Sequence, residues 1–208
     1  TPKEFSPIFS DYLQAQHYQD KALGEFIENL RQQGILDKSL LVIYGDHFGS
    51  GFVPQDFEKL LNLPQPLNEY TSKELNKVPL LIRLPGGTAA GVKHISGGQM
   101  DLLPTLINLL GLDKSKSLYF GQDLLNSKDG FSAFRFYSPD GTFATNEVFY
   151  LAAKDGVFEH GTAYDRKTGQ KTDLERCRDG FRRATWQLNM SDLILETNGL
   201  PQLLPKIH

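Results

Sequence analysis

The chain has 208 residues, ordinary hydrophobic content at 39%, a formal net charge of −3 and a pI of about 5.9, which favour one acidic globular domain, alone or with an appendage. Without a long run of lysine or arginine it lacks a basic nucleic-acid-binding surface, so no nucleic-acid partner is expected. The single cysteine excludes an intrachain disulfide, no signal peptide is visible, and the most apolar segment is shorter than the roughly 20 residues of a membrane-spanning helix.

The N-terminal part begins with a predicted helix and a predicted strand. Apolar residues recur at helical spacing over residues 11–33, and Gly34 is a suitable stop. Residues 40–44 are apolar at every position, which predicts a strand buried on both faces, as in a parallel or mixed sheet. A helix, a short loop and a buried strand in this order indicate an α/β fold.

A long polar segment separates this strand from the next one. Residues 52–77 contain three prolines and are predicted to form a loop, with a short helix near 56–61. Residues 78–86 predict a second strand that ends at a Pro-Gly turn. Residues 101–110 predict a helix, with Asp101 as its N-cap.

The pattern changes beyond about residue 130. Short strand-like segments alternate with Pro-Asp-Gly, Lys-Asp-Gly and Lys-Thr-Gly turns, which predicts an antiparallel meander. These segments are residues 133–138, 147–153 and 156–165. A last helix is predicted over 173–197, with Cys177 on its apolar stripe. We therefore expect an α/β region over 1–128 and a small antiparallel subdomain with a closing helix over 129–208.

Asp46 and His47 form the candidate metal site. They follow the strand predicted over 40–44, and open α/β sheets place their sites at the carboxyl ends of strands. Glycines at 45 and 49 make a turn possible in which both side chains reach one ion. A carboxylate oxygen and an imidazole nitrogen suit zinc or manganese. The alternative is a capping aspartate beside a surface histidine, with no metal.

Other residues with reactive side chains are expected to have ordinary roles. Cys177 is expected to be a buried and inert thiol. The chain has no Gly-x-Ser-x-Gly, Cys-x-x-Cys or His-Glu-x-x-His motif. The remaining histidines lie on a predicted helix, in turn-rich segments or at the C-terminus, and none is expected to bind a metal: His17, His94, His160 and His208.

Three segments together resemble a known family. They read "VIYGDHFG", "GGQMDLLPTLINLLGL" and "LYFGQDLLN". This combination resembles the lipoteichoic acid synthases, which are phosphoglycerol transferases of the sulfatase and alkaline-phosphatase-like superfamily. The resemblance covers residues 1 to about 126, with only general architecture shared beyond. It implies a partial alkaline-phosphatase-like α/β fold with a small C-terminal antiparallel sheet and a helix.

The resemblance also implies the ligand set of the metal site. Asp46 and His47 match two of the family's ligands to a single ion, with Mn²⁺ as the first choice and Mg²⁺ or Zn²⁺ as alternatives. The family's other ligands are a glutamate and the nucleophilic threonine, and both are expected upstream of Thr1. We therefore expect this chain to be the C-terminal part of a catalytic domain, to lack a catalytic nucleophile and to be inactive alone. The upstream half would be its partner, and surface left exposed without it could pair two copies of the chain.

For the intact protein the resemblance implies a two-step transfer. The threonine would attack phosphatidylglycerol, release diacylglycerol and then pass glycerophosphate to a growing polyglycerolphosphate chain. The site would lie on the extracellular face of a bacterial membrane, anchored by an upstream membrane region. Two alternatives stay open: another phosphotransferase or hydrolase of the superfamily, such as a phosphoethanolamine transferase or a sulfatase, and a non-catalytic cell-wall interaction module.

Overall fold

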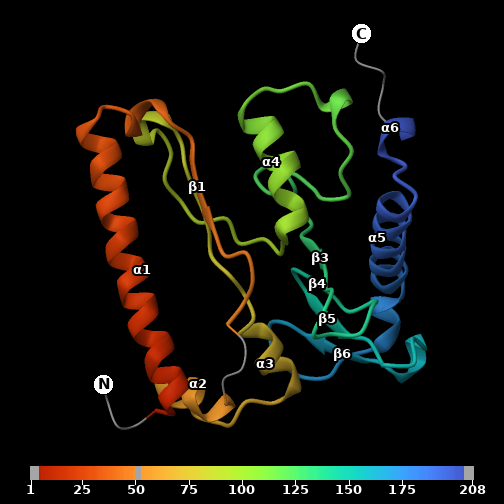
Figure 1. Cartoon of the computed structure of the whole chain (residues 1–208). Helices are drawn as coiled ribbons and strands as arrows, with labels where there is room; N and C mark the ends of the chain where they lie inside the picture. The colour runs from red at the N-terminus through yellow and green to blue at the C-terminus, as the bar shows by residue number, and fades with distance from the viewer. Residues whose placement is uncertain (1–4, 50–52, 204–208) are drawn as a thin grey trace. The chain divides into compact units, whose positions relative to one another are not determined.

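The structure, a computed structural model, describes residues 5–49 and 53–203 and divides into two compact units, 1–92 and 93–208. Both units mix helices with short strands (Figure 1), so the predicted combination of helix and sheet is confirmed. The boundary predicted at residue 128 lies inside the second unit, and that division of the sequence stays a prediction. In the described part of the chain, no helix combines the length and the apolar character needed to cross a bilayer.

A long helix and a two-stranded ribbon make up most of the first unit. The helix predicted over 11–33 begins four residues earlier, after Ser6, where the buried carboxylate of Asp56 accepts hydrogen bonds from the Ser6 backbone N–H (3.0 Å) and hydroxyl. The short helix α2 (Pro54–Leu60), which carries Asp56, therefore fixes the start of α1 (Pro7–Gln32). The elements of this unit are α1 (Pro7–Gln32), η1 (Leu36–Lys38), β1 (Leu41–Tyr44), α2 (Pro54–Leu60), α3 (Glu69–Glu74), β2 (Leu80–Arg83) and η2 (Pro85–Gly87).

The strand predicted over 40–44 is present, but its surroundings differ from the expectation. β1 pairs with β2 in antiparallel register, with Leu41 opposite Arg83, so the prediction of a parallel or mixed sheet is wrong for the described residues. Tyr44 on β1 is 49% exposed and Leu81 on β2 is 56% exposed, so the expected burial on both faces is also wrong. An unbroken apolar run predicts a strand but says nothing about the direction of its neighbour. The ribbon leaves apolar surface uncovered within the described residues of this unit.

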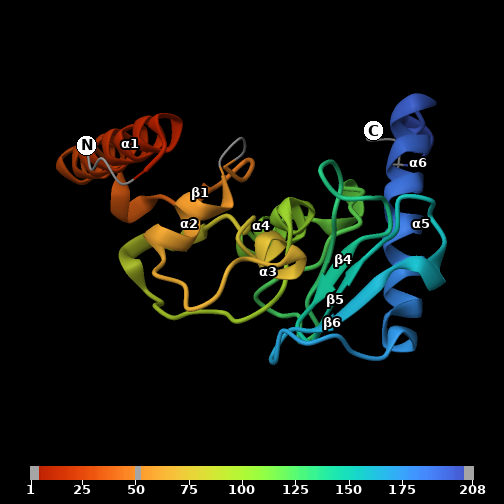
Figure 2. The ribbon, with the colours of Figure 1, turned by 90° about the horizontal axis from the view of Figure 1, so that it is seen from below.

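The second unit is built on a four-stranded antiparallel sheet. Its strands follow one another in chain order, so the predicted meander is confirmed. One face packs against α5 (Figure 2), and the aromatic rings of Phe143 and Tyr150 fill the space between sheet and helix with Cys177 and Ala184. The elements are η3 (Gln99–Asp101), α4 (Leu102–Leu109), η4 (Lys114–Lys116), β3 (Phe131–Ala133), β4 (Phe143–Thr145), β5 (Val148–Leu151), η5 (Phe158–His160), β6 (Thr162–Asp165), η6 (Leu174–Cys177), α5 (Arg178–Glu196) and α6 (Leu200–Leu203).

Two details of the predicted meander are wrong. The strand expected over 133–138 ends at Ala133, because Phe136 and Tyr137 both adopt positive φ, at 55° and 48°, and leave the ladder. Their side chains are 76% and 75% exposed. The structure also contains a strand that the sequence did not predict, β4, which is only three residues long. Part of the segment expected to be a strand over 156–165 is instead the 3₁₀ turn η5.

The helix predicted over 101–110 is confirmed as α4, but Asp101 does not cap it through its side chain. The buried carboxylate instead accepts the backbone N–H of Gly98 (2.8 Å) and of Gln122 (2.7 Å). It therefore ties the start of α4 to the loop at 121–122. That loop passes so close to the backbone of Met100 that a Cβ on Gly121 would lie 2.0 Å from the Met100 carbonyl oxygen.

Gly180, in the first turn of α5, supplies a test of the packing between helix and sheet. A Cβ at this position would lie 2.1 Å from the buried ring of Phe143, so Gly180→Ala should destabilise the second unit by about 1–3 kcal/mol through overpacking. The matched control is Gly24→Ala in α1, where a Cβ meets nothing within 4 Å and helix propensity should stabilise by up to about 1 kcal/mol. Urea unfolding followed by circular dichroism measures both variants, and Trp186 fluorescence reports on the second unit. An equal gain in stability for the two variants would contradict the packing described.

Candidate metal centre

The backbone leaves β1 under a tight steric constraint at Gly45. Its N–H donates to the Pro79 carbonyl at 3.1 Å, which extends the β1–β2 pairing by one residue. A Cβ on Gly45 would lie 2.6 Å from the Cβ of Val78, closer than real side chains approach. The close approach, and not a left-handed turn, therefore accounts for glycine at this position. The next two residues are held directly beyond the end of the ribbon.

Asp46 and His47 both project into solvent at this end. Their side chains are 85% and 76% exposed, and Asp46 Oδ1 lies 3.8 Å from His47 Nε2. The His47 backbone N–H also donates to Asp46 Oδ1 at 2.9 Å, which fixes the carboxylate relative to the turn. The two side chains therefore converge in the way that the sequence predicted. Their role as metal ligands stays a prediction.

The imidazole of His47 is oriented so that Nε2 is the nitrogen available to a metal. Its Nδ1 lies 2.7 Å from the backbone carbonyl oxygen of Phe48. A carbonyl oxygen can only accept a hydrogen bond, so Nδ1 carries the proton and the lone pair of the neutral ring is on Nε2. A hydrogen bond from the second ring nitrogen to a backbone carbonyl is the usual support of a metal-bound histidine.

The donor atoms fit a divalent ion of the transition series. Two ligand atoms about 2.0–2.2 Å from one tetrahedral ion are separated by roughly 3.3–3.6 Å, so the observed 3.8 Å requires only a small closing movement of these exposed side chains. One carboxylate oxygen and one imidazole nitrogen suit manganese or zinc. Among the described residues no cluster of three or more His, Cys, Asp or Glu side chains is placed to hold an ion. A catalytic ion usually takes three protein ligands, so this pair needs further donors from other residues.

Of the other histidines that the structure describes, only His160 lies beside a carboxylate. His17 and His94 are exposed, and His160 directs Nδ1 to the Asp155 carboxylate at 2.6 Å. This second Asp–His pair lowers the pKa of Asp155 and offers a natural control for metal-binding experiments. His208 lies outside the described residues.

Cys177 is confirmed as a buried thiol. It is fully buried between helix and sheet, and burial raises its pKa to about 11. The thiolate is the reactive form, so this cysteine is inert at neutral pH.

Comparison with known proteins places the chain in a family. A family model described as "Sulfatase" matches residues 2–112, and the chain belongs to the sulfatase family. Lipoteichoic acid synthase 1 of Bacillus subtilis is 34% identical to it over 188 residues, covering 88% of this chain and 27% of that protein. The lipoteichoic acid synthase of Staphylococcus aureus is 33% identical, with the same coverage of 88% and 27%.

A solved structure shares the fold at similar sequence identity. The lipoteichoic acid synthase LtaP from Listeria monocytogenes matches with a TM-score of 0.81 and 29% identity, over 100% of this chain and 49% of that one. The expected resemblance to lipoteichoic acid synthases and the partial sulfatase-type fold are therefore confirmed. The similarity is longer than the 126 residues expected, because it includes the small antiparallel sheet and α5. The chain spans between about a quarter and a third of the length of these curated relatives.

Direct metal binding tests the pair without any enzymatic reaction. We expect the 208-residue chain to bind Mn²⁺ weakly, because it contributes two donors, and Asp46→Ala or His47→Ala to weaken this binding at least about tenfold. Calorimetry supplies the affinity, and paramagnetic broadening of NMR signals by Mn²⁺ supplies the location. The double variant Asp155→Ala, His160→Ala is the control and should bind as the unaltered chain does. Tight binding, or binding unaffected by both site variants, would contradict a two-donor site at Asp46 and His47.

Proposed function

We propose that this chain is part of a metal-dependent phosphoglycerol transferase of the lipoteichoic acid synthase type. The observation that carries the proposal is the exposed Asp46–His47 pair, with His47 Nδ1 against the Phe48 carbonyl, at the end of β1 in a sulfatase-family chain. Similarity to proteins named lipoteichoic acid synthase, at 33–34% identity, supports this substrate class over a sulfatase or a phosphoethanolamine transferase.

The chain's own residues would hold and orient one ion. Asp46 would supply a carboxylate oxygen and His47 its Nε2, while the Phe48 carbonyl keeps the imidazole in the required tautomer. Manganese is the first choice, with magnesium or zinc as alternatives. A bound ion of this kind makes a hydroxyl nucleophile more acidic and stabilises charge on a phosphoryl group.

The remaining parts of the reaction follow from the proposed class. A threonine and a glutamate outside this chain would complete the site, phosphatidylglycerol would be the donor, and a polyglycerolphosphate chain would be the acceptor. The active site would lie on the extracellular face of a bacterial membrane, with an anchor elsewhere in the protein. We propose that the 208-residue chain alone has no transferase activity, because phosphoryl transfer through a covalent intermediate needs a nucleophile held against the ion.

Release of diacylglycerol from fluorescent phosphatidylglycerol tests this function. The intact protein that contains this chain should release diacylglycerol with Mn²⁺, and Asp46→Ala or His47→Ala should lower the rate by at least about 100-fold. His160→Ala, which removes a histidine paired to Asp155, should leave the rate unchanged.

Two results would contradict the proposal. One is metal-dependent release by the 208-residue chain alone that His47→Ala abolishes, since the chain would then hold a complete site. The other is an intact protein that cleaves an aryl sulfate but releases no diacylglycerol.

A further inference from the structure

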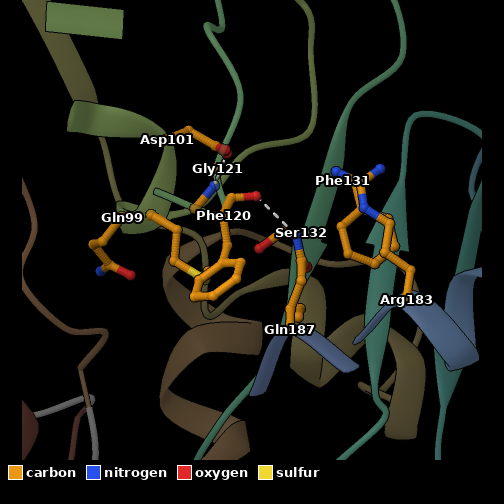
Figure 3. A pocket seen from close by; sticks show the side chains of 11 residues that line it. Gln99, Asp101, Phe120, Gly121, Phe131, Ser132, Arg183 and Gln187 are labelled. Carbon is orange, nitrogen blue, oxygen red and sulfur yellow. Dashed lines mark hydrogen bonds between the residues drawn. The ribbon is translucent and has the colours of Figure 1, made fainter. Parts of the chain in front are cut away.

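Arg183, on α5, has an unusual setting for an arginine. Its guanidinium carbon lies 4.0 Å from the centre of the Phe131 ring (Figure 3), so the cation covers an aromatic side chain of the sheet. Of the arginines in the described residues, Arg183 alone has neither an ion pair nor a hydrogen bond to a protein group. In its neighbour Arg182, by contrast, Nη1 lies 3.6 Å from Oδ1 of Asp179.

The nearest acidic influence on Arg183 does not neutralise it. Asp101 interacts with it only at long range, and the oxygens of Asp101 already accept the backbone N–H groups of Gly98 and Gln122. Burial lowers the pKa of Arg183, although a guanidinium stays protonated throughout the physiological range. Arg183 is a solvent-exposed residue, so its protonated guanidinium is accessible to an anionic ligand.

Two hollows of the second unit meet at this side chain. The smaller, of about 60 Å³, is lined by Arg183 together with Ser132, Gln187 and Asp101 (Figure 3). Gln187 is itself fixed by a hydrogen bond from its amide to the Phe120 carbonyl at 2.9 Å. A hollow of this size holds a few waters or one small polar group.

The larger hollow, of about 360 Å³, falls in the size range of small-molecule sites. Arg183 lies on it with Arg176, Asp129 and Glu147. Arg176 is 3.6 Å from Glu147, whereas Asp129 has no ion pair or hydrogen bond among the described residues. This larger hollow, called the groove below, therefore presents the unpaired guanidinium of Arg183 and the unpaired carboxylate of Asp129 to the same ligand.

We propose that this groove binds a polyol phosphodiester, with the phosphate on Arg183 and the hydroxyl groups of the polyol on Asp129. The inference rests on the proposed function, in which the growing acceptor is a chain of glycerol units joined by phosphodiesters. A planar guanidinium matches two oxygens of a phosphate, and a carboxylate accepts hydrogen bonds from hydroxyls. The carboxylates disfavour a simple polyanion, so the ligand must carry donors as well as charge.

Binding to the 208-residue chain tests the groove without catalysis. The probe is glycerophosphoglycerol, the soluble diester of two glycerols, titrated in the millimolar range while amide NMR signals are recorded. We expect shifts at Ser132, Thr145 and Asn146, which lie around the two hollows. Vesicles of phosphatidylglycerol form a second arm, because a lipid headgroup has the same chemistry. Stronger binding of the soluble diester identifies the polymer as the source of the ligand.

Matched variants assign the binding to Arg183. Arg183→Gln should weaken it by about tenfold or more, and Arg183→Lys, which keeps the charge and the aliphatic stem, should restore only part of it. Arg182→Gln makes the same charge change on the adjacent, 70% exposed side chain and should alter the affinity less than about twofold. Circular dichroism and Trp186 fluorescence confirm that each variant is folded.

The proposal is overturned by any of three results: no binding of the diester by the unaltered chain, equal losses in Arg182→Gln and Arg183→Gln, or tighter binding of phosphoethanolamine than of the diester. Because the readout is binding, it separates this inference from the transferase proposal. Diester binding that depends on Arg183, in a protein that releases no diacylglycerol, would leave the groove standing and remove the proposed reaction. Diacylglycerol release by a protein that does not bind the diester would support the proposed reaction and remove the proposed groove.

Discussion

The candidate metal centre depends on how closely the backbone at Gly45 passes Val78. The hydrogen bond from Gly45 to the Pro79 carbonyl continues the β1–β2 pairing to the last residue before the turn, where no side chain larger than hydrogen fits. This contact fixes the position of the backbone that carries Asp46 and His47. The Phe48 carbonyl then sets the tautomer of the imidazole, so one short turn determines the placement of both donors and the ring nitrogen that faces outward.

Sequence patterns predicted the elements whose causes are local. The helices α1, α4 and α5 follow from 3.6-residue periodicity, and the Asp-His turn after an apolar run identified the candidate donors. Features set by distant partners could not be predicted in this way. The antiparallel pairing of β1 depends on β2, some forty residues away, and the Asp101 carboxylate serves Gln122 rather than its own helix. Two consecutive positive φ angles at Phe136 and Tyr137 also leave no signal in a run of strand-forming residues.

The second unit combines an aromatic core with an arginine, Arg183, that has no ion pair among the described residues. Packed rings of Phe143, Tyr150 and Phe158 hold the sheet against α5, and the buried Tyr150 hydroxyl donates to the Phe158 carbonyl at 2.9 Å. Arg183 projects from that helix, and its guanidinium packs on the ring of Phe131. No sequence pattern marks Arg183 apart from Arg182, because the difference lies in what surrounds each side chain.

Anomalous diffraction from crystals of the intact protein grown with manganese tests whether Asp46 and His47 bind the ion, because it locates the ion without reference to activity. We expect one strong manganese peak about 2.0–2.2 Å from an Asp46 carboxylate oxygen and from His47 Nε2, with the Phe48 carbonyl still accepting from Nδ1. A peak bound elsewhere in the domain, with Asp46 and His47 outside bonding distance, would contradict the assignment of this turn as the metal centre.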